Sequence, residues 1–251
     1  AERYRSQWRH GLRRLFDEGA YFHEAAYPYA GTVTCAGHAS ISTGAVPAVH
    51  GMVLNSWYDR AIAARRPCTV DDAVTPVGFT KAITARHSGR WIEAATFAER
   101  LSASQAPGTG RVAAFSLKAR SAIGLAGKRG DAVVWFEPAG TFATSSAYAA
   151  PEWLDAHLKA NPIERAIDAS WTRARAATAY RGSDEGVGER PPAGWTTSFP
   201  HALSSGRANA QFYDRWQRSP YSDAYLAEMA IAAVDQMRLG RGAGIDYLGV
   251  S

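Results

Sequence analysis

Continuous apolar runs of strand length recur along the chain and predict a buried sheet. Runs that are apolar at successive positions are typical of strands covered on both faces. Three of them are clear: RVAAFSL (111–117), DAVVWFEPAG (131–140) and IDYLGVS (245–251). An earlier segment, AYFHEAAYPYAGTVT (20–34), predicts strands and a turn.

Between these runs, apolar residues recur at helical spacing. The pattern predicts helices over 36–43, 90–104, 151–160 and 222–240, and an opening helix on Trp8, Leu12, Leu15 and Phe16 with Gly19 as its C-cap. Strands that alternate with helices indicate an α/β fold with a mainly parallel sheet flanked by helices. Residues 169–210 are rich in Trp, Arg, Gly and Pro without periodicity, which predicts an irregular excursion over the sheet. Such excursions often cap an active site.

Composition and charge favour a soluble globular enzyme. Of 251 residues, 46% are apolar and 20% charged, which allows a sizeable core and argues against a disordered chain. The formal net charge is +5, but the basic residues are scattered, so no nucleic-acid partner is expected. No run of about 18 apolar residues occurs, so no membrane span is expected.

Both ends of the chain favour a piece of a longer protein. The chain begins inside the predicted opening helix and ends on the predicted strand 245–251. A domain seldom stops inside a core strand. We therefore expect a single domain over residues 1–251 that is incomplete at both ends.

Cys35 and Cys68 are the two cysteines of the sequence. Two cysteines do not make a disulfide framework, so two separate free thiols are favoured, with a bridge as the alternative. The pair does not have the pattern of a metal site.

Thr34 lies where a β-rich run meets a predicted helix start. A hydroxyl there meets backbone N–H groups and the positive end of the helix dipole, a position that favours a phosphoryl group. A nearby divalent cation would convert the hydroxyl into a nucleophilic alkoxide. The plainer alternative is that Thr34 is only an N-cap, the commoner role of Thr at such a junction.

Lys118 and Arg120 follow the predicted strand 111–117 directly. Side chains two apart on an extended segment share a face, so both cations can converge on one anion. The alternative is two solvated surface cations.

Taken together, these segments resemble the alkaline phosphatase superfamily, and most closely its PafA-type branch, which has a threonine nucleophile. The resemblance is carried, in order and over nearly the whole chain, by YPYAGTVTCAGHASISTGAVPAVHGMVLNSWYDR, SLKARSAI, GDAVVWFEPAGTFATSSAY and SPYSDAYLAEMAIAAV…IDYLGVS. It implies an alkaline-phosphatase-like α/β fold with a cap insertion at about residues 169–210.

The resemblance also implies roles for individual residues. Thr34 matches the nucleophile, which in the family is also a zinc ligand. Asn55 matches a residue that hydrogen-bonds a phosphoryl oxygen, and Lys118 and Arg120 match a clamp on the transferred phosphoryl group. Cys35 falls among the substrate-binding positions.

The same family includes phosphodiesterases and nucleotide pyrophosphatases, which lack the Lys-x-Arg clamp and so leave room for a second ester substituent. An additional cationic clamp suits the dianionic phosphate of a monoester. The resemblance therefore implies a metal-dependent phosphate monoester hydrolase that acts through a phospho-threonine intermediate on a small-molecule ester. The alternatives are phosphodiesterase or nucleotide pyrophosphatase activity on the same scaffold, and a non-catalytic module that binds phosphate-containing ligands.

Zinc is the cofactor that the resemblance implies, with two ions held by Asp and His residues at positions that this chain does not contain. Thr34 is the inherited ligand, so this chain by itself is expected to hold no stoichiometric zinc and to be inactive. His38 and His50 are not spaced as zinc ligands and are expected to be structural. Relatives are usually exported, which implies a periplasmic or extracellular location.

Overall fold

The computed structural model describes residues 2–180, 182–204 and 206–251. The chain divides into two units, residues 1–30 and 31–251. The smaller unit contains a 3₁₀ helix, η1 (Glu2–Gln7), and the helix α1 (Gly11–Glu18). The rings of Trp8 and Phe16 lie 4.9 Å apart and those of Phe16 and Tyr21 4.6 Å apart, so an aromatic cluster holds this unit together.

The predicted opening helix is confirmed in α1, but the strands predicted within residues 20–34 are absent from this described segment. Backbone N–H and C=O groups form a strand only where a second strand completes the ladder. The described part of residues 1–30 offers none, and Tyr27 and Tyr29 instead pack their rings 5.3 Å apart.

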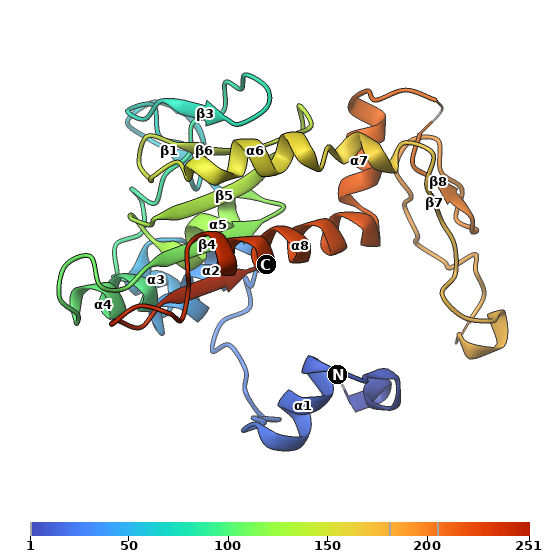
Figure 1. Ribbon diagram of the computed structural model, residues 1–251, viewed down its shortest axis with the longest axis horizontal. Coiled ribbons are helices and arrows are strands. Elements are labelled where there is room, and N and C mark those ends of the chain that lie inside the picture. The colour runs from blue at the N-terminus through green and yellow to red at the C-terminus, as the bar shows by residue number, and fades with distance from the viewer. Residues whose placement is uncertain (1, 181, 205) are drawn as a thin grey trace. The chain divides into compact units, whose positions relative to one another are not determined.

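A mixed sheet of five strands lies at the centre of residues 31–251 (Figure 1). In spatial order the strands are β3 (Pro76–Gly78), β6 (Thr141–Ser145), β5 (Ala132–Glu137), β4 (Val112–Ser116) and β9 (Tyr247–Val250). β5, β4 and β9 are parallel, with Ala114 opposite Val133 and Gly249. β6 pairs antiparallel with β5 because the chain reverses at Gly140, whose φ of 80° suits a residue without a Cβ.

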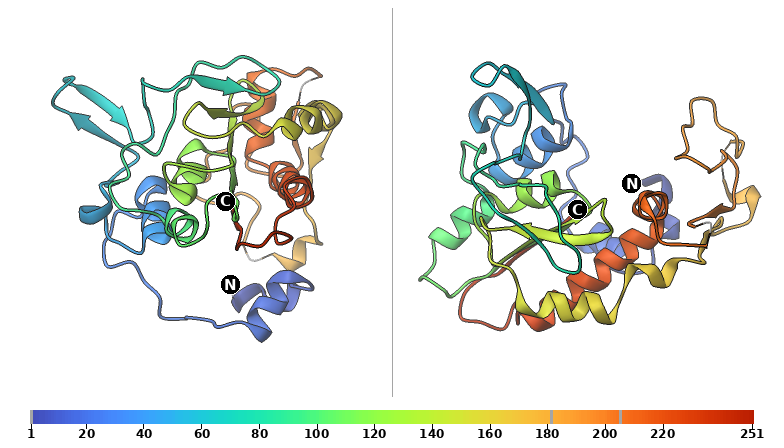
Figure 2. Two further views of the ribbon diagram at one scale, coloured as in Figure 1. Left: turned by 60° about the vertical axis from the view of Figure 1, so that its left-hand side comes forward. Right: turned by 90° about the horizontal axis from the view of Figure 1, so that it is seen from above.

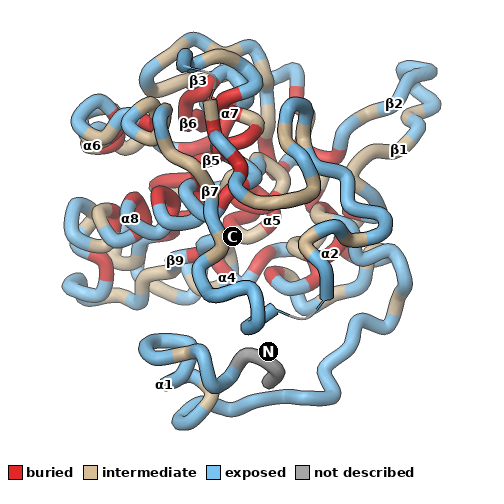
Figure 3. The backbone as a smooth tube through the Cα atoms, turned by 90° about the vertical axis from the view of Figure 1, so that its right-hand side faces the viewer, coloured by how far each residue is buried: buried red, intermediate tan, exposed pale blue. Residues whose placement is uncertain are grey.

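Two groups of helices cover the two faces of this sheet (Figure 2). One group consists of α2 (Thr34–Thr43), α4 (Phe97–Ala103) and α5 (Ala119–Ala126), and the other of α6 (Glu152–Ala160), α7 (Ala210–Gln217) and α8 (Pro220–Gln236). Alternate residues of the central strands supply the two cores: Phe115 packs towards α6–α8 and Ala114 towards α2, α4 and α5. The buried residues are concentrated in these strands and in the inner sides of the helices (Figure 3). The predicted α/β fold with a helix-flanked sheet is thereby confirmed.

Helix α4 is shorter than predicted. It begins at Phe97, because Thr96 and Glu99 form a capping box in which each side chain bonds the other residue's backbone N–H. Residues 90–96 instead run as an irregular segment on which Trp91 Nε1 donates to the carbonyl of Val70 at 2.8 Å.

The remaining elements are short. They are α3 (Pro47–His50), the hairpin β1 (Ser56–Asp59) and β2 (Ala64–Pro67), η2 (Ile163–Ala166), β7 (Ser170–Trp171), η3 (Ala177–Ala179) and β8 (His201–Ala202). None of the helices in the described part of the chain combines the length and the apolar character needed to cross a bilayer.

The irregular excursion predicted at residues 169–210 contains, before α7 begins at Ala210, only the small β7–β8 pair and η3 among its described residues. Two of its residues, 181 and 205, lie outside the described part of the chain. Its rings pack together, with Trp195 stacked on His201 at 4.7 Å and Trp171 5.1 Å from Phe199. It lies next to α7, to the right of the sheet in Figure 1. Its role as a cap stays a prediction.

The central strand β4 makes the packing testable. Phe115 is fully buried between β5, β9 and α8, so Phe115→Ala leaves a cavity and should lower the free energy of unfolding by about 3–5 kcal/mol. Ile231 on α8 is 66% exposed, and Ile231→Ala should change it by less than about 0.5 kcal/mol. Urea denaturation of both variants measures the difference, and similar losses would contradict the assigned core.

Candidate functional site

Helix α2 begins at Thr34. The N-cap is Val33, whose backbone is extended (φ −67°, ψ 167°), so Thr34 is the first helical residue and the interpretation of Thr34 as the N-cap is wrong. Its side chain is half-buried, and its hydroxyl makes no hydrogen bond to any other described residue. The hydroxyl is therefore available beside the positive end of a ten-residue helix.

Asn55 is held beside this helix start by two hydrogen bonds. Its Oδ1 accepts from the backbone N–H of Cys35 at 2.9 Å, and its carbonyl oxygen accepts from the N–H of Cys68 at 3.0 Å. Its Nδ2 has no hydrogen-bond partner within the described chain and is left free to donate. The structure thus brings Thr34, Cys35 and Asn55 together, although 20 positions separate Cys35 from Asn55.

Cys35 and Cys68 form a disulfide, with their Cα atoms 6.7 Å apart, so the prediction of two free thiols is wrong. The cause is the hairpin β1–β2, in which Ser56 pairs with Pro67 and Asp59 with Ala64. The hairpin returns the chain to its starting point, which places Cys68 opposite Asn55 and therefore next to α2. The spacing of the two cysteines in the sequence does not reveal that the hairpin brings them together.

Lys118 and Arg120 lie at the start of α5, immediately after β4. Lys118 is the exposed N-cap, with an extended backbone (φ −142°, ψ 130°), and Arg120 is half-buried in the first helical turn. The two residues are thus not on one extended segment as the sequence suggested. Arg120 Nε is buried and has no hydrogen-bond partner among the described residues, so its guanidinium is not committed to an internal ion pair.

The starts of α2 and α5 lie at one edge of the sheet. β4 and β9 are parallel and end together, and the N–H of Ser251, just past β9, donates to the carbonyl of Phe115 at 3.1 Å. His38, one turn into α2, lies 2.9 Å from Ser251 Oγ through its Nε2. Ligands of open α/β sheets bind at this carboxyl edge. The five predicted site residues therefore gather in one region.

Two titratable groups, His87 and Glu137, lie next to each other, and His87 is within electrostatic range of Arg120. His87 Nδ1 is 3.0 Å from Thr69 Oγ1, and His87 Nε2 is 4.0 Å from Glu137 Oε1. Burial lowers the pKa of His87, and the positive charge of Arg120 acts in the same direction. Burial raises the pKa of Glu137, while a 2.7 Å hydrogen bond from Trp135 Nε1 partly opposes that rise. A neutral imidazole here adds no competing positive charge next to Arg120.

The model of the type I phosphodiesterase / nucleotide pyrophosphatase family matches residues 3–217. The chain belongs to this family.

The relatives that this family member resembles include several alkaline phosphatases. Alkaline phosphatase PafA of Elizabethkingia meningoseptica is 29% identical over 251 residues, which cover 96% of this chain and 45% of that protein. The crystal structure of wild-type alkaline phosphatase PafA matches with a TM-score of 0.84 at 26% identity, over 99% of this chain and 49% of that one. A PafA variant in which a threonine is replaced by serine and an asparagine, a lysine and an arginine by alanine matches with a TM-score of 0.75 at 26% identity, over 88% and 44% of the two chains.

These likenesses confirm the resemblance to the PafA-type branch and its fold. The chain spans about half the length of the relatives it matches.

The family suggests metal dependence. Across residues 2–180, 182–204 and 206–251, however, no three His, Cys, Asp or Glu side chains are grouped so as to hold a metal ion. Cys35 and Cys68 are joined in the disulfide, and one threonine hydroxyl is too weak a ligand to hold an ion alone. The described residues of this phosphodiesterase-family chain thus do not by themselves fit a zinc site.

His38 and His50 have other partners in this family member. His38 Nδ1 is 2.9 Å from the carbonyl oxygen of Thr34, so with its contact to Ser251 it joins α2 to the end of β9. His50 is fully buried, with Nε2 3.0 Å from Ser40 Oγ and Nδ1 accepting from the N–H of Met52 at 3.1 Å. Both sets of contacts are structural in kind.

The disulfide and the His87–Glu137 pair are features of the site that the sequence did not predict. A lone carboxylate that ends a buried apolar run, as Glu137 does, is the one sequence signal that could have drawn attention to the pair. His87 lies in an irregular segment and offered none.

The buried His50 predicts a specific pH dependence of stability. Burial holds the pKa of His50 below its ordinary value of 6.5, so its neutral form stabilises the fold fully above pH 6.5 and that contribution is lost as pH falls through the lower folded pKa. His50→Gln should therefore flatten the loss of unfolding free energy between about pH 7.5 and about pH 5 in urea denaturation. His10, an exposed histidine, provides the control, and His10→Gln should keep the wild-type slope. Parallel profiles for wild type and His50→Gln would contradict the prediction.

Proposed function

We propose that this chain carries the nucleophile and the phosphate-binding half of a phosphate monoester hydrolase. The observation that supports the proposal best is the uncommitted hydroxyl of Thr34 at the start of α2, with Asn55 fixed beside it. Lys118 and Arg120 start the neighbouring helix at the same sheet edge. A hydroxyl, an amide donor and two cations at one helix-rich edge form a site that suits a phosphoryl group.

In the proposed reaction, Thr34 Oγ1 attacks phosphorus as the bond to the leaving oxygen breaks. The hydroxyl loses its proton to water, and the leaving alcohol takes one up, which gives a phospho-threonine. Water then attacks the same phosphorus, releases inorganic phosphate and restores the hydroxyl. The charge that this displacement spreads over the non-bridging oxygens is met by Asn55 Nδ2, the Lys118 ammonium and the Arg120 guanidinium.

The two cations favour a monoester as the substrate. A monoester dianion carries three non-bridging oxygens, and Arg120 offers a planar fork while Lys118 offers a point charge. A diester carries a single negative charge and needs space for a second substituent. Phosphodiesterase or pyrophosphatase activity remains the second candidate, because the family model that matches most of the chain carries that description.

The PafA variant supports this assignment through its spacing. Its substituted threonine and asparagine are 21 positions apart, and its substituted lysine and arginine two apart. Thr34 and Asn55 are likewise 21 positions apart (55 − 34), and Lys118 and Arg120 two apart (120 − 118). The same four residue types thus recur at the same spacings.

We further propose two zinc ions for the whole protein, with Thr34 as the one described residue that would touch them. The disulfide supports the proposed periplasmic or extracellular location, because structural disulfides persist in oxidising compartments.

The nucleophile is tested by substitution in the whole protein. Thr34→Ala should abolish formation of the phospho-enzyme and monoester turnover, since a methyl group cannot attack phosphorus, while Thr34→Ser should keep part of the activity. Quenched-flow trapping with radiolabelled phosphate monoester, and circular dichroism for the fold, check both. Turnover by Thr34→Ala at the wild-type rate would remove Thr34 from the mechanism, and phosphate binding without any turnover in wild type would favour the non-catalytic module.

The clamp is tested by comparing two substrates. Lys118→Ala and Arg120→Ala should each slow monoester hydrolysis by roughly 10²–10³, the usual loss for one preorganised electrostatic partner. Diester hydrolysis should fall less, because a diester presents less charge. The measurement is kcat/KM for matched aryl mono- and diesters, and equal losses on both would assign the two cations to structure alone.

A further inference from the structure

The disulfide Cys35–Cys68 encloses Asn55 in a small covalent and hydrogen-bonded frame. Asn55 Oδ1 accepts from the N–H of one half-cystine, and its carbonyl oxygen accepts from the N–H of the other. Asn55 is thus tied to both half-cystines, to Cys35 through its side chain and to Cys68 through its backbone. Cys35 and Cys68 are 1% and 0% exposed.

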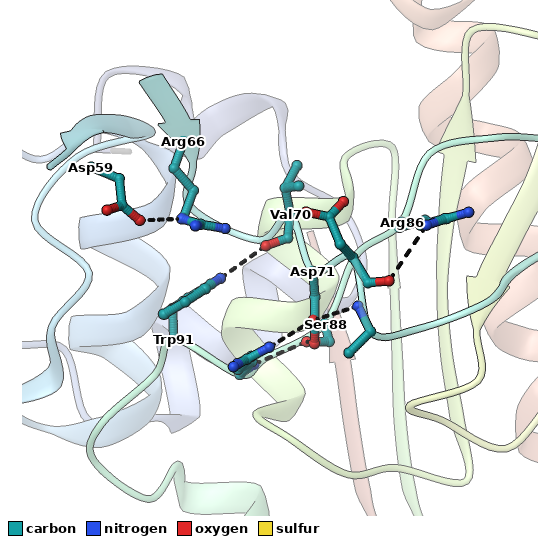
Figure 4. Close-up of polar contacts among 10 residues, drawn as sticks. Asp59, Arg66, Val70, Asp71, Arg86, Ser88 and Trp91 are labelled. Atoms are coloured by element: carbon teal, nitrogen blue, oxygen red, sulfur yellow. Dashed lines mark hydrogen bonds and ion pairs between the residues drawn. The ribbon is translucent and has the colours of Figure 1, made fainter. Parts of the chain in front are cut away.

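One end of this frame is anchored to the body of the protein (Figure 4). Thr69, next to Cys68, accepts the N–H of Ser88 at 2.9 Å, and Val70 accepts Trp91 Nε1 at 2.8 Å. Asp71 accepts the hydroxyl of Ser88 at 2.6 Å. Residues 69–71 are therefore held in place by three hydrogen bonds to Ser88 and Trp91.

The hairpin that Asn55 begins is anchored from its outer side. Arg66 in β2 pairs with Asp59 at 2.7 Å, and its guanidinium lies 4.7 Å from the ring centroid of Trp91 (Figure 4). Within the described chain, β1 and β2 pair with each other and with no other strand. The hairpin is thus fixed to the segment around Trp91, and the disulfide is the covalent link from its foot to α2.

We propose that the Cys35–Cys68 disulfide is a positioning element of the phosphate site, because it holds Asn55 Oδ1 on the Cys35 amide and so leaves Asn55 Nδ2 to donate at the start of α2. The link to phosphate binding rests on the proposed function, whereas the effect of the disulfide on the position of Asn55 does not. Cys35 and Cys68 touch no phosphoryl group through sulfur. They act through Asn55.

Cleavage of the S–S bond releases this link. A water-soluble phosphine takes up one oxygen atom from water as the bond breaks, and two thiols form. The hairpin foot is then free to separate from α2, and the hydrogen bond from Cys35 N–H to Asn55 Oδ1 is lost with it.

Amide hydrogen exchange tests the structural part on this chain. Reduction with the phosphine should speed exchange at the Cys35 and Cys68 amides by about 10-fold or more, since a lost hydrogen bond of about 1.4 kcal/mol corresponds to that factor. Amides of the central strand β5 serve as the internal control and should stay unchanged. Unchanged exchange at Cys35 in a chain whose disulfide has been cleaved would overturn the proposal, whatever the chain does with phosphate.

Binding of inorganic phosphate, measured by calorimetry, tests the link to Asn55. Reduction should raise the Kd for phosphate by the same factor, about 10-fold, in wild type and in Lys118→Ala. In Asn55→Ala, reduction should leave the Kd unchanged, because this variant already lacks the side chain that reduction displaces in wild type. The double variant Cys35→Ser/Cys68→Ser should behave as the reduced wild type in both measurements, which controls for effects of the phosphine.

Two results would distinguish failure of this proposal from failure of the proposed function. An equal rise in Kd for Asn55→Ala would overturn the proposal, since the disulfide would then support the fold in general. An oxidised wild-type chain that binds no phosphate would count against the proposed function alone, and the exchange of the Cys35 amide would still decide the role of the disulfide.

Discussion

The close packing of α2 on α5 is the constraint on which the site depends. At Gly124 of α5, a Cβ atom would lie 2.8 Å from the Cβ of His38, a distance that real Cβ atoms essentially never show. Glycine at this position lets the two helices approach, and that approach carries Thr34 to the sheet edge where Lys118 and Arg120 begin α5. His38 completes the arrangement through its contact with Ser251 at the end of β9. A larger residue at 124 would push α2 away from α5, and so Thr34 away from Lys118 and Arg120.

The first turns of α2 and α5 lack the charges that usually stabilise the start of a helix. Acidic residues stabilise the first turn of a helix, yet neither α2 nor α5 has one there, and α5 instead begins with Lys118 and Arg120. Positive charge gathers where the helix dipole is already positive, which costs stability in the free protein. A bound anion offsets that cost, and a ligand that binds only the folded state stabilises it. Such local conflicts are typical of functional sites.

The segment that supports the site, residues 52–92, has little regular secondary structure. Residues 52–92 contain one small hairpin, the strand β3 and much irregular backbone, but buried polar contacts around Trp91, Asp71 and Ser88 hold them. Fully satisfied buried hydrogen bonds give such a segment a single conformation. It therefore supports both Asn55, through the disulfide, and the surroundings of Arg120, through His87.

The sequence by itself determined the α/β fold, the central strands β4, β5 and β9 and the helices α6 and α8, because their patterns are local and follow the periods of strand and helix. With the family resemblance, it also determined the candidates Thr34, Asn55, Lys118 and Arg120. Tertiary structure alone decided the Cys35–Cys68 bond, the anchoring of Asn55 and the pairing of His87 with Glu137. These depend on a hairpin that returns the chain to its start and on strands that meet side by side, and contacts between residues 20 to 50 positions apart leave no periodic trace in the sequence.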